Sequence, residues 1–148
     1  MIGIILEIGI SENPGGKMHS VSNVEAVAGK GLVNDRHHKE GNKNRSQITL
    51  IEIENIDYYN QISGTSIPPI NFRRNIITKG IQLNDLVGKE ILIGNVKIKG
   101  HRLCAPCRYL QEMLKQKNLV KKLLNRGGLR CEILTDGIIS VNDPIKQI

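Results

Sequence analysis

Short apolar runs recur along the chain, separated by glycine, proline, asparagine and aspartate. Runs of this length, rich in isoleucine and valine, predict β-strands rather than helices. Gly94 and Asn95 predict a two-residue hairpin turn, and we expect a second tight turn at Asp136 and Gly137. So many strands with so few long helical patterns predict a mainly β fold, a closed or nearly closed β-barrel with a few short helices. The runs cover residues 2–10, 21–28, 47–51, 75–78, 90–93, 96–99, 129–134 and 138–141.

Three stretches carry helical rather than strand spacing. Residues 51–62 combine apolar and polar positions at mixed helical spacings, and residues 110–114 place their leucines and methionine on one face. Asn118 is expected to cap a third, short turn that ends at a pair of glycines. The stretch 64–70, "GTSIPPI", is the clearest loop, because its two prolines stiffen it. By length alone, residues 1–148 are expected to form a single domain.

The composition changes the expected core and the expected partners. Aromatic residues make up only 3% of the chain, so isoleucine, leucine and valine must fill the core. The formal net charge of +7 favours anionic partners, which are nucleic acid, a membrane surface or a phosphorylated small molecule. Nucleic acid is disfavoured, because one phenylalanine and three tyrosines offer few platforms on which bases can stack.

The expected location follows from the absence of targeting signals. No apolar stretch reaches the length of a membrane-spanning helix. The opening segment "MIGIILEIGI" lacks a basic leader and carries Glu7, so we expect a first strand rather than a signal peptide. Three cysteines without a leader favour free thiols in a reducing cytoplasm.

The segment 101–110, "HRLCAPCRYL", contains two of the three cysteines, Cys104 and Cys107. Three kinds of site use this spacing: a zinc knuckle, a redox dithiol, or one working thiolate beside a bystander. Zinc is disfavoured, because there is no second CxxC and the spacing of Cys131 and the four histidines matches no finger or ribbon. A redox dithiol normally needs a βαβ context, which this strand-rich pattern does not provide.

A single working cysteine fits the segment best at Cys107. Pro106 fixes the backbone before it, and the residues after it begin a helix. His101, Arg102 and Arg108 are close in sequence, and electropositive settings of this kind favour the thiolate form. Such a thiolate can carry a persulfide or ligate a soft metal.

The other two cysteines have a simpler interpretation. Cys104 alternates with Leu103, and Cys131 lies among apolar neighbours in "LRCEIL". A lone cysteine most often packs as a small hydrophobic residue. We therefore expect Cys131 in the core and keep the same interpretation open for Cys104.

Other segments accompany the cysteine motif in a fixed order. A glycine-rich turn leads into Asp35, Arg36 and His37, where backbone amides and a guanidinium could face an anion. In order along the chain, the segments are 31–37 ("GLVNDRH"), 73–80 ("RRNIITKG"), 83–94 ("LNDLVGKEILIG"), 106–107 ("PC"), 126–129 ("RGGL") and 137–143 ("GIISVND"). Taken together they resemble the MOSC family, the domain related to the C-terminal part of molybdenum-cofactor sulfurases. The resemblance runs from about residue 2 to residue 145.

The resemblance implies a barrel like the pyruvate-kinase β-barrel, with a pocket over Cys107. In the family this cysteine is proposed to carry sulfur received from a pyridoxal-phosphate enzyme, a cysteine desulfurase. Alternatively, it is proposed to bind the molybdenum of molybdenum cofactor (molybdopterin). The implied partners are therefore a desulfurase-type sulfur donor and the cofactor itself or a molybdoenzyme.

The phosphate of the pterin cofactor would require cationic ligands. The candidates by charge and spacing are Arg36, Arg74, Arg102 and Arg130, each of which could equally be a solvated surface arginine. Asp35 belongs to the same cluster as Arg36. Asn75 could orient a pocket group or hold a turn, and His37 could exchange protons or have a structural role.

Two asparagines depart from the family pattern. Asn34 and Asn142 stand where the pattern has glycine. Because asparagine tolerates a left-handed backbone better than most residues, we expect both turns to survive.

These observations support three functions. The first is a stand-alone MOSC-domain protein that binds molybdenum cofactor or carries sulfur as a persulfide on Cys107. The second, a molybdenum-dependent reductase of N-hydroxylated compounds, resembles larger family members. The third is a small redox protein that uses Cys104 and Cys107 as a dithiol.

Overall fold

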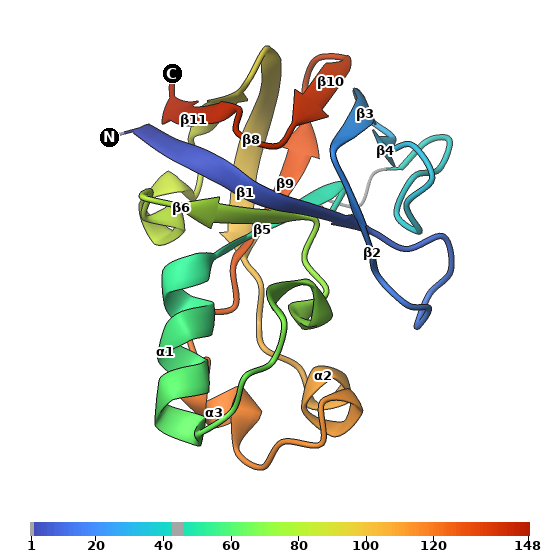
Figure 1. Cartoon of the computed structure of the whole chain (residues 1–148). Coiled ribbons are helices and arrows are strands. Elements are labelled where there is room, and N and C mark those ends of the chain that lie inside the picture. Colours follow the sequence, from blue (N-terminus) through green and yellow to red (C-terminus); the bar gives the residue numbers. More distant parts are fainter. Residues whose placement is uncertain (1, 43–45) are drawn as a thin grey trace.

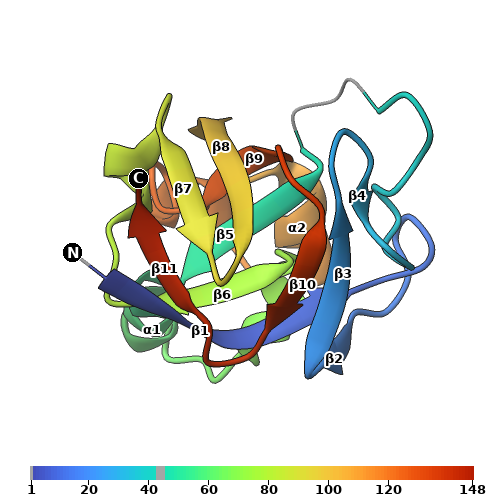
Figure 2. The same ribbon diagram turned by 90° about the horizontal axis from the view of Figure 1, so that it is seen from above.

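A seven-stranded β-barrel forms the body of the protein in the computed structural model, which describes residues 2–42 and 46–148 (Figures 1 and 2). Its strands are β1 (Ile2–Ile10), β5 (Ile48–Glu52), β6 (Ile76–Lys79), β7 (Glu90–Ile93), β8 (Val96–Leu103), β9 (Leu129–Ile133) and β11 (Pro144–Gln147). Around the barrel the order is β1-β11-β7-β8-β9-β5-β6, and the pairing of β6 with β1 closes it. The predicted mainly β, barrel-like fold is confirmed.

A smaller sheet lies beside the barrel. It has the order β10-β3-β4, from Gly137–Ser140, Asn23–Val27 and Gly31–Leu32. Strand β2 (His19–Val21) pairs with the second half of β1 and leads into β3. Figure 2 shows this sheet along one side of the barrel, where β10 and β3 run next to each other.

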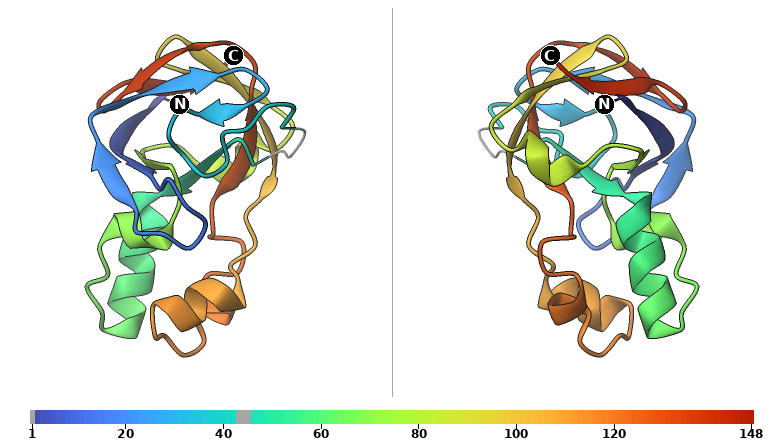
Figure 3. Two further views of the ribbon diagram at one scale, coloured as in Figure 1. Left: turned by 90° about the vertical axis from the view of Figure 1, so that its right-hand side faces the viewer. Right: turned by 90° about the vertical axis from the view of Figure 1, so that its left-hand side faces the viewer.

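The helices lie at one end of the barrel (Figure 1). All paired strands are antiparallel except β5 and β6, and a parallel pair requires a crossover connection. Here the crossover consists of α1 (Ile53–Ser63) and the 3₁₀ helix η1 (Pro69–Phe72). Helices α2 (Arg108–Met113) and α3 (Leu119–Lys122) connect β8 to β9 (Figure 3). None of the helices in the described ranges is long and apolar enough to cross a bilayer.

Two apolar clusters hold these layers together. Strand β9 buries Leu129, Cys131 and Ile133 on alternate positions, as a strand with one face towards a barrel interior should. A second cluster joins the helices to the barrel. In it Tyr59 and Phe72 pack edge to face, with ring centroids 6.0 Å apart and planes at 81°. The helical end is therefore attached through its own hydrophobic layer.

Several local expectations about the strands were wrong. The run 21–28 is divided at Ser22 between β2 and β3, because the two pieces pair with different partners, β1 and β10. Asp136 and Gly137 do not form a hairpin turn, because β10 leaves β9 and joins the smaller sheet. The Asp136 carboxylate instead accepts the amide of Ala28 at 2.7 Å. The hairpin at Gly94 and Asn95 is confirmed by the pairing of β7 with β8.

Strands β4 and β11 and the second half of β8 were not predicted. β4 has only two residues, and β11 has a single buried side chain, Ile145. β8 continues past Lys99 to Leu103, so that Arg102 lies in a strand. The left-handed backbone expected at Asn34 and Asn142 is confirmed, with φ of 69° and 75°.

Candidate functional site

A pocket of about 310 Å³ opens beside the first turn of α2. Four segments that are distant in sequence meet there: the loop after β1, the turn after β4, the segment before β6, and the start of α2. The lining residues are Pro14, Gly15, Arg36, His37, Arg73, Arg74, Cys107, Tyr109 and Leu110. The predicted glycine-rich turn and the cysteine motif thus converge on one cavity.

Cys107 is the N-cap residue of α2. Its Sγ accepts the backbone N–H of Leu110 at 3.4 Å, so a helix-end donor already faces the sulfur. Cys107 is exposed, whereas Cys104 has an exposed fraction of 3% and Cys131 of 0%. Burial raises the pKa of Cys131 well above its usual value, so this thiol stays protonated. The three cysteines therefore have different chemical roles open to them.

The turn between α3 and β9 fixes the backbone of the cysteine loop at Cys104. The amide of Cys104 donates to the carbonyl of Gly128 at 2.7 Å. Gly128 has φ of 105°, and a Cβ there would overlap the carbonyl oxygen of Leu50. Arg74 reaches the same turn from the barrel, since its Nε donates to the carbonyl of Gly127 at 2.9 Å. The "RGGL" segment thus lets the cysteine loop, β5 and Arg74 approach one another.

Asp35 organises the turn that brings Arg36 to the pocket. Its buried carboxylate accepts the amide of Ser11 at 3.1 Å, Nη1 of Arg36 at 3.2 Å and the amide of His37 at 3.3 Å. Arg36 also donates from Nη2 to the carbonyl of Arg73 at 3.2 Å. The Asp35 carboxylate thus accepts hydrogen bonds that stabilise the turn, and it holds the Arg36 guanidinium in place at the pocket wall.

The pocket concentrates positive charge. Burial lowers the pKa of Arg36, and the charges of Arg73 and Arg74 lower it further, while Asp35 acts in the opposite direction. Burial, followed by the charge of Arg36, also lowers the pKa of His37, which favours a neutral imidazole. Three guanidinium groups beside a single buried carboxylate leave a cationic site that can accept an anion.

Comparison with known proteins identifies the family. The MOSC domain model matches residues 34–146 of the chain. This chain belongs to the MOSC family. No curated protein sequence matches the chain at a significant level. The family match begins at the Asn34 turn and includes the pocket arginines and Cys107.

Solved structures similar to this MOSC domain support the fold. YuaD from Bacillus subtilis has a TM-score of 0.85 at 20% identity, over 98% of this chain and 94% of that one. YiiM from Geobacillus stearothermophilus has a TM-score of 0.78 at 16% identity, over 99% and 75%. YiiM from Escherichia coli has a TM-score of 0.74 at 15% identity, over 98% and 69%.

The MOSC pocket contains some of the residues expected from the sequence and not others. Arg36, His37, Arg74 and Cys107 line it, and Asp35 lies directly behind it. Arg102 is exposed on β8 and does not line this pocket. Arg130 is half-buried on β9, near enough for its charge to lower the pKa of His37. Asn75 is fully buried under β1 and β5.

Arg73 and Tyr109 also line the pocket with polar side chains, and neither was among the candidates. Arg73 ends η1 with φ of 65°, and its side chain donates to the carbonyl of Gly16. Tyr109 has an exposed fraction of 55% and follows Cys107 by two positions on α2. The pair of arginines in "RRN" could have indicated Arg73 as a pocket residue. Tyr109 reaches the pocket only through the geometry of α2, which the sequence does not reveal.

Native thiol labelling is expected to modify one cysteine of this MOSC domain. Cys107 is exposed, and Cys104 and Cys131 are buried, so iodoacetamide should add one equivalent to the folded protein and three after denaturation. Peptide mass spectrometry identifies the modified residue. Labelling of Cys104 at a rate similar to that of Cys107 would contradict the burial of Cys104.

The lowered pKa of His37 predicts a pH dependence of stability. Below about pH 6.5, His37 binds a proton in the unfolded chain while the folded side chain remains neutral. The free energy of unfolding therefore decreases as the pH falls towards the pKa of His37 in the folded protein. The His37→Gln variant should show a shallower loss of stability on acidification. Chemical denaturation at several pH values between about 5 and 8 measures the two slopes. Equal slopes would mean that His37 titrates normally.

Proposed function

We propose that this MOSC domain carries sulfur as a persulfide on Cys107 and can hold molybdenum cofactor in the same pocket. The observation that supports this most directly is the position of Cys107. It is the exposed thiol among the three cysteines, and it lines a pocket with Arg36, Arg73 and Arg74. We place this chemistry in the cytoplasm, where thiols stay reduced.

Sulfur loading at Cys107 requires one bond exchange. The thiolate attacks the outer sulfur of a persulfide on the donor enzyme, and a new S–S bond forms. The donor's S–S bond breaks, and its cysteine leaves as a thiolate with the electron pair. One sulfur atom moves without an external oxidant or reductant. The Leu110 amide donates to the Cys107 sulfur, and the guanidinium groups that line the same pocket would face the incoming donor.

The donor set of the pocket also fits molybdenum cofactor. Cys107 offers a soft sulfur ligand, and Arg36, Arg73 and Arg74 would hold a phosphate. Within residues 2–42 and 46–148, no group of three histidine, cysteine, aspartate or glutamate side chains could hold a metal. Cys107 would be the sulfur ligand that the pocket offers to molybdenum. When bound, the cofactor supplies two-electron redox chemistry, and a reductase acting on N-hydroxylated compounds is the corresponding alternative activity.

The burial of Cys104 disfavours the dithiol alternative. A redox dithiol needs both sulfurs within reach of an exchanging thiol, and Cys104 has an exposed fraction of only 3%. Its environment supports the interpretation that it packs in the core. A carrier with one exposed thiol needs no second cysteine.

Loading by a donor protein tests the proposal. The purified protein is incubated with a cysteine desulfurase and L-cysteine, and its intact mass is measured. We expect the addition of one sulfur atom per chain. In a second arm, the protein is mixed with molybdenum cofactor and desalted, and we expect bound molybdenum to remain. The proposal would be overturned if the protein gained no sulfur and also retained no molybdenum.

The segment 108–126 offers a surface for the donor. It contains six cationic residues and one carboxylate, Glu112, a surplus of five in a chain whose formal net charge is +7. The cationic residues are Arg108, Lys115, Lys117, Lys121, Lys122 and Arg126. Among the described ion pairs none involves these six. Because the segment begins next to Cys107, we infer that it attracts an acidic surface on the donor protein.

Charge reversal in this segment is expected to slow loading by a protein donor. The double variant Lys117→Glu/Lys121→Glu makes the charge of this surface more negative by four units. We expect the rate of persulfide loading from the donor protein to be at least about tenfold lower at low salt. Loading from inorganic polysulfide, which needs no docking surface, should change little. The matched control is Lys89→Glu/Lys146→Glu, two exposed residues outside the helical end. Equal effects of the two pairs would contradict a specific docking surface.

A further inference from the structure

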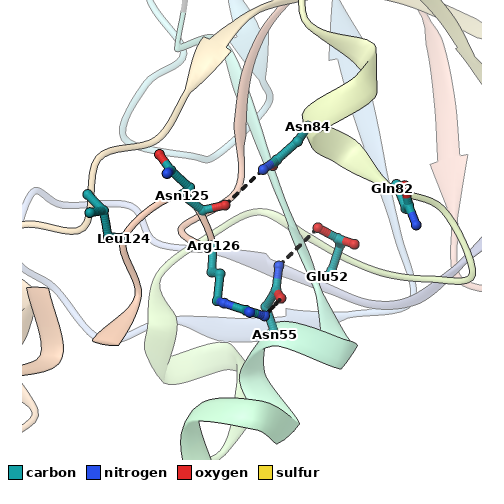
Figure 4. A pocket seen from close by; sticks show the side chains of 7 residues that line it. All are labelled: Glu52, Asn55, Gln82, Asn84, Leu124, Asn125 and Arg126. Carbon is teal, nitrogen blue, oxygen red and sulfur yellow. Dashed lines mark hydrogen bonds between the residues drawn. The ribbon is translucent and has the colours of Figure 1, made fainter. Parts of the chain in front are cut away.

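A second pocket of about 460 Å³ lies apart from the Cys107 pocket and shares none of its lining residues (Figure 4). It is an open surface pocket bordered by the start of α1, the 3₁₀ helix η2 (Leu83–Leu86) with the residue before it, and the turn that follows α3. The lining residues are Glu52, Asn55, Gln82, Asn84, Leu124, Asn125 and Arg126. Four carboxamides, one carboxylate and one guanidinium make this cavity polar and charged with both signs.

Opposite charges face this pocket without pairing directly. Nη1 of Arg126 donates to Oδ1 of Asn55 at 3.2 Å, and Nδ2 of Asn55 donates to Oε2 of Glu52 at 2.9 Å. The carboxamide of Asn55 therefore separates the two charges, and the described ion pairs do not include Arg126 with Glu52. Arg126 also lies over the ring of Tyr58, with its guanidinium carbon 4.0 Å from the centroid.

The remaining carboxamides have unused hydrogen-bonding groups. Nδ2 of Asn84 donates to the backbone carbonyl of Asn125 at 2.9 Å, which leaves its Oδ1 available. The side chains of Gln82 and Asn125 have no hydrogen-bond partner within the described parts of the chain. Figure 4 shows Asn84 and Asn125 across the cavity from Asn55. The pocket therefore offers donors and acceptors between its two charged groups.

We propose that this pocket binds an α-amino acid with a polar side chain, held as its zwitterion. The carboxylate of the ligand would pair with Arg126, whose planar guanidinium presents several N–H groups, and its ammonium group with Glu52. A ligand with only one charge leaves either Glu52 or Arg126 without a counterion. The carboxamides of Gln82, Asn84 and Asn125 would hydrogen-bond the polar side chain.

The electrostatics of Glu52 agree with a cationic group in the ligand. Burial raises the pKa of Glu52, and the neighbouring Glu54 raises it further, while hydrogen bonds from Leu83 and Asn55 and the charge of Arg126 lower it. A bound ammonium group would offset the first two effects and favour the ionised carboxylate. This site does not depend on Cys107, so it goes beyond sulfur and molybdenum chemistry.

A titration followed by NMR of the side-chain amides tests the proposal. The probes are L-glutamine, L-glutaminamide, which lacks the carboxylate, and 4-carbamoylbutanoate, which lacks the ammonium group. We expect saturable shifts of the Asn55, Asn84 and Asn125 amide signals with L-glutamine, and at least tenfold weaker binding of both analogues. No saturable shift, or equal affinities for the three probes, would overturn the proposal.

Two variants test whether L-glutamine binds between Glu52 and Arg126, and a third tests whether it binds in the Cys107 pocket instead. Glu52→Gln and Arg126→Gln should each weaken L-glutamine binding at least tenfold. Glutamine at position 52 retains an oxygen that can accept the hydrogen bonds from Leu83 and Asn55, which protects the fold. Cys107→Ala should leave L-glutamine affinity unchanged. If it abolished binding while the protein remained folded, the ligand would occupy the other pocket and the proposal would be wrong.

Discussion

The Cys107→Ala variant is expected to lose both persulfide loading and molybdenum retention. Each activity depends on a sulfur nucleophile or ligand, and no other exposed cysteine lies among the three in the chain. We expect alanine to be tolerated because Cys107 is exposed and its side-chain hydrogen bond from Leu110 is long at 3.4 Å. Intact mass after incubation with the donor measures the first loss, and metal analysis after desalting measures the second. We expect both signals to fall to background.

The matched control is Cys104→Ala. This residue is buried three positions before Cys107, and its removal should leave loading and molybdenum retention close to the wild-type levels. A modest loss of stability is expected, because a buried sulfur is deleted. Loading that persists in Cys107→Ala and disappears in Cys104→Ala would show that the wrong cysteine has been chosen.

The Asn75→Ala variant is expected to lose about 3 kcal/mol of folding free energy, because several buried polar groups lose their partners. Oδ1 of Asn75 accepts both the amide and the hydroxyl of Thr49 at 3.1 Å, and Nδ2 donates to the carbonyl of Gly9 at 3.1 Å. The side chain thus connects β1, β5 and the segment before β6. Urea denaturation followed by circular dichroism measures the change.

Arg102→Ala serves as the control for Asn75→Ala. Arg102 is exposed on β8, and its replacement should change the free energy of unfolding by less than about 0.5 kcal/mol. The comparison also decides between the two roles considered for Asn75. If Asn75→Ala kept full stability but lost persulfide loading, the carboxamide would act in the pocket rather than in the barrel.

The barrel was predictable because local sequence patterns indicate most of its strands. Apolar runs at β1, β5, β7 and β9 alternate or continue over strand length, and glycine or asparagine separates them. The division at Ser22 was not predictable, since nothing within the run 21–28 indicates that its two halves pair with different strands. Partner choice depends on contacts across the whole chain, such as that of β3 with β10.

The site was predictable where its geometry is local. Pro106, Cys107 and the helix that follows are contiguous, so the capping position of the sulfur could be expected from the sequence. Asn75 depends on Gly9, which is 66 residues away, and no local pattern reveals that hydrogen bond. Arg102 was grouped with the pocket by its charge and its spacing along the chain. In the longer strand Arg102 is exposed and does not line the pocket.

The role of Cys107 is tested most directly by locating the transferred sulfur in the wild-type protein. After incubation with a desulfurase and L-cysteine, the persulfide is trapped with an alkylating reagent, and the peptides are sequenced by tandem mass spectrometry. We expect one additional sulfur atom on Cys107, with Cys104 and Cys131 unmodified. Sulfur found on Cys104 or Cys131, or on no cysteine, would contradict this role of Cys107.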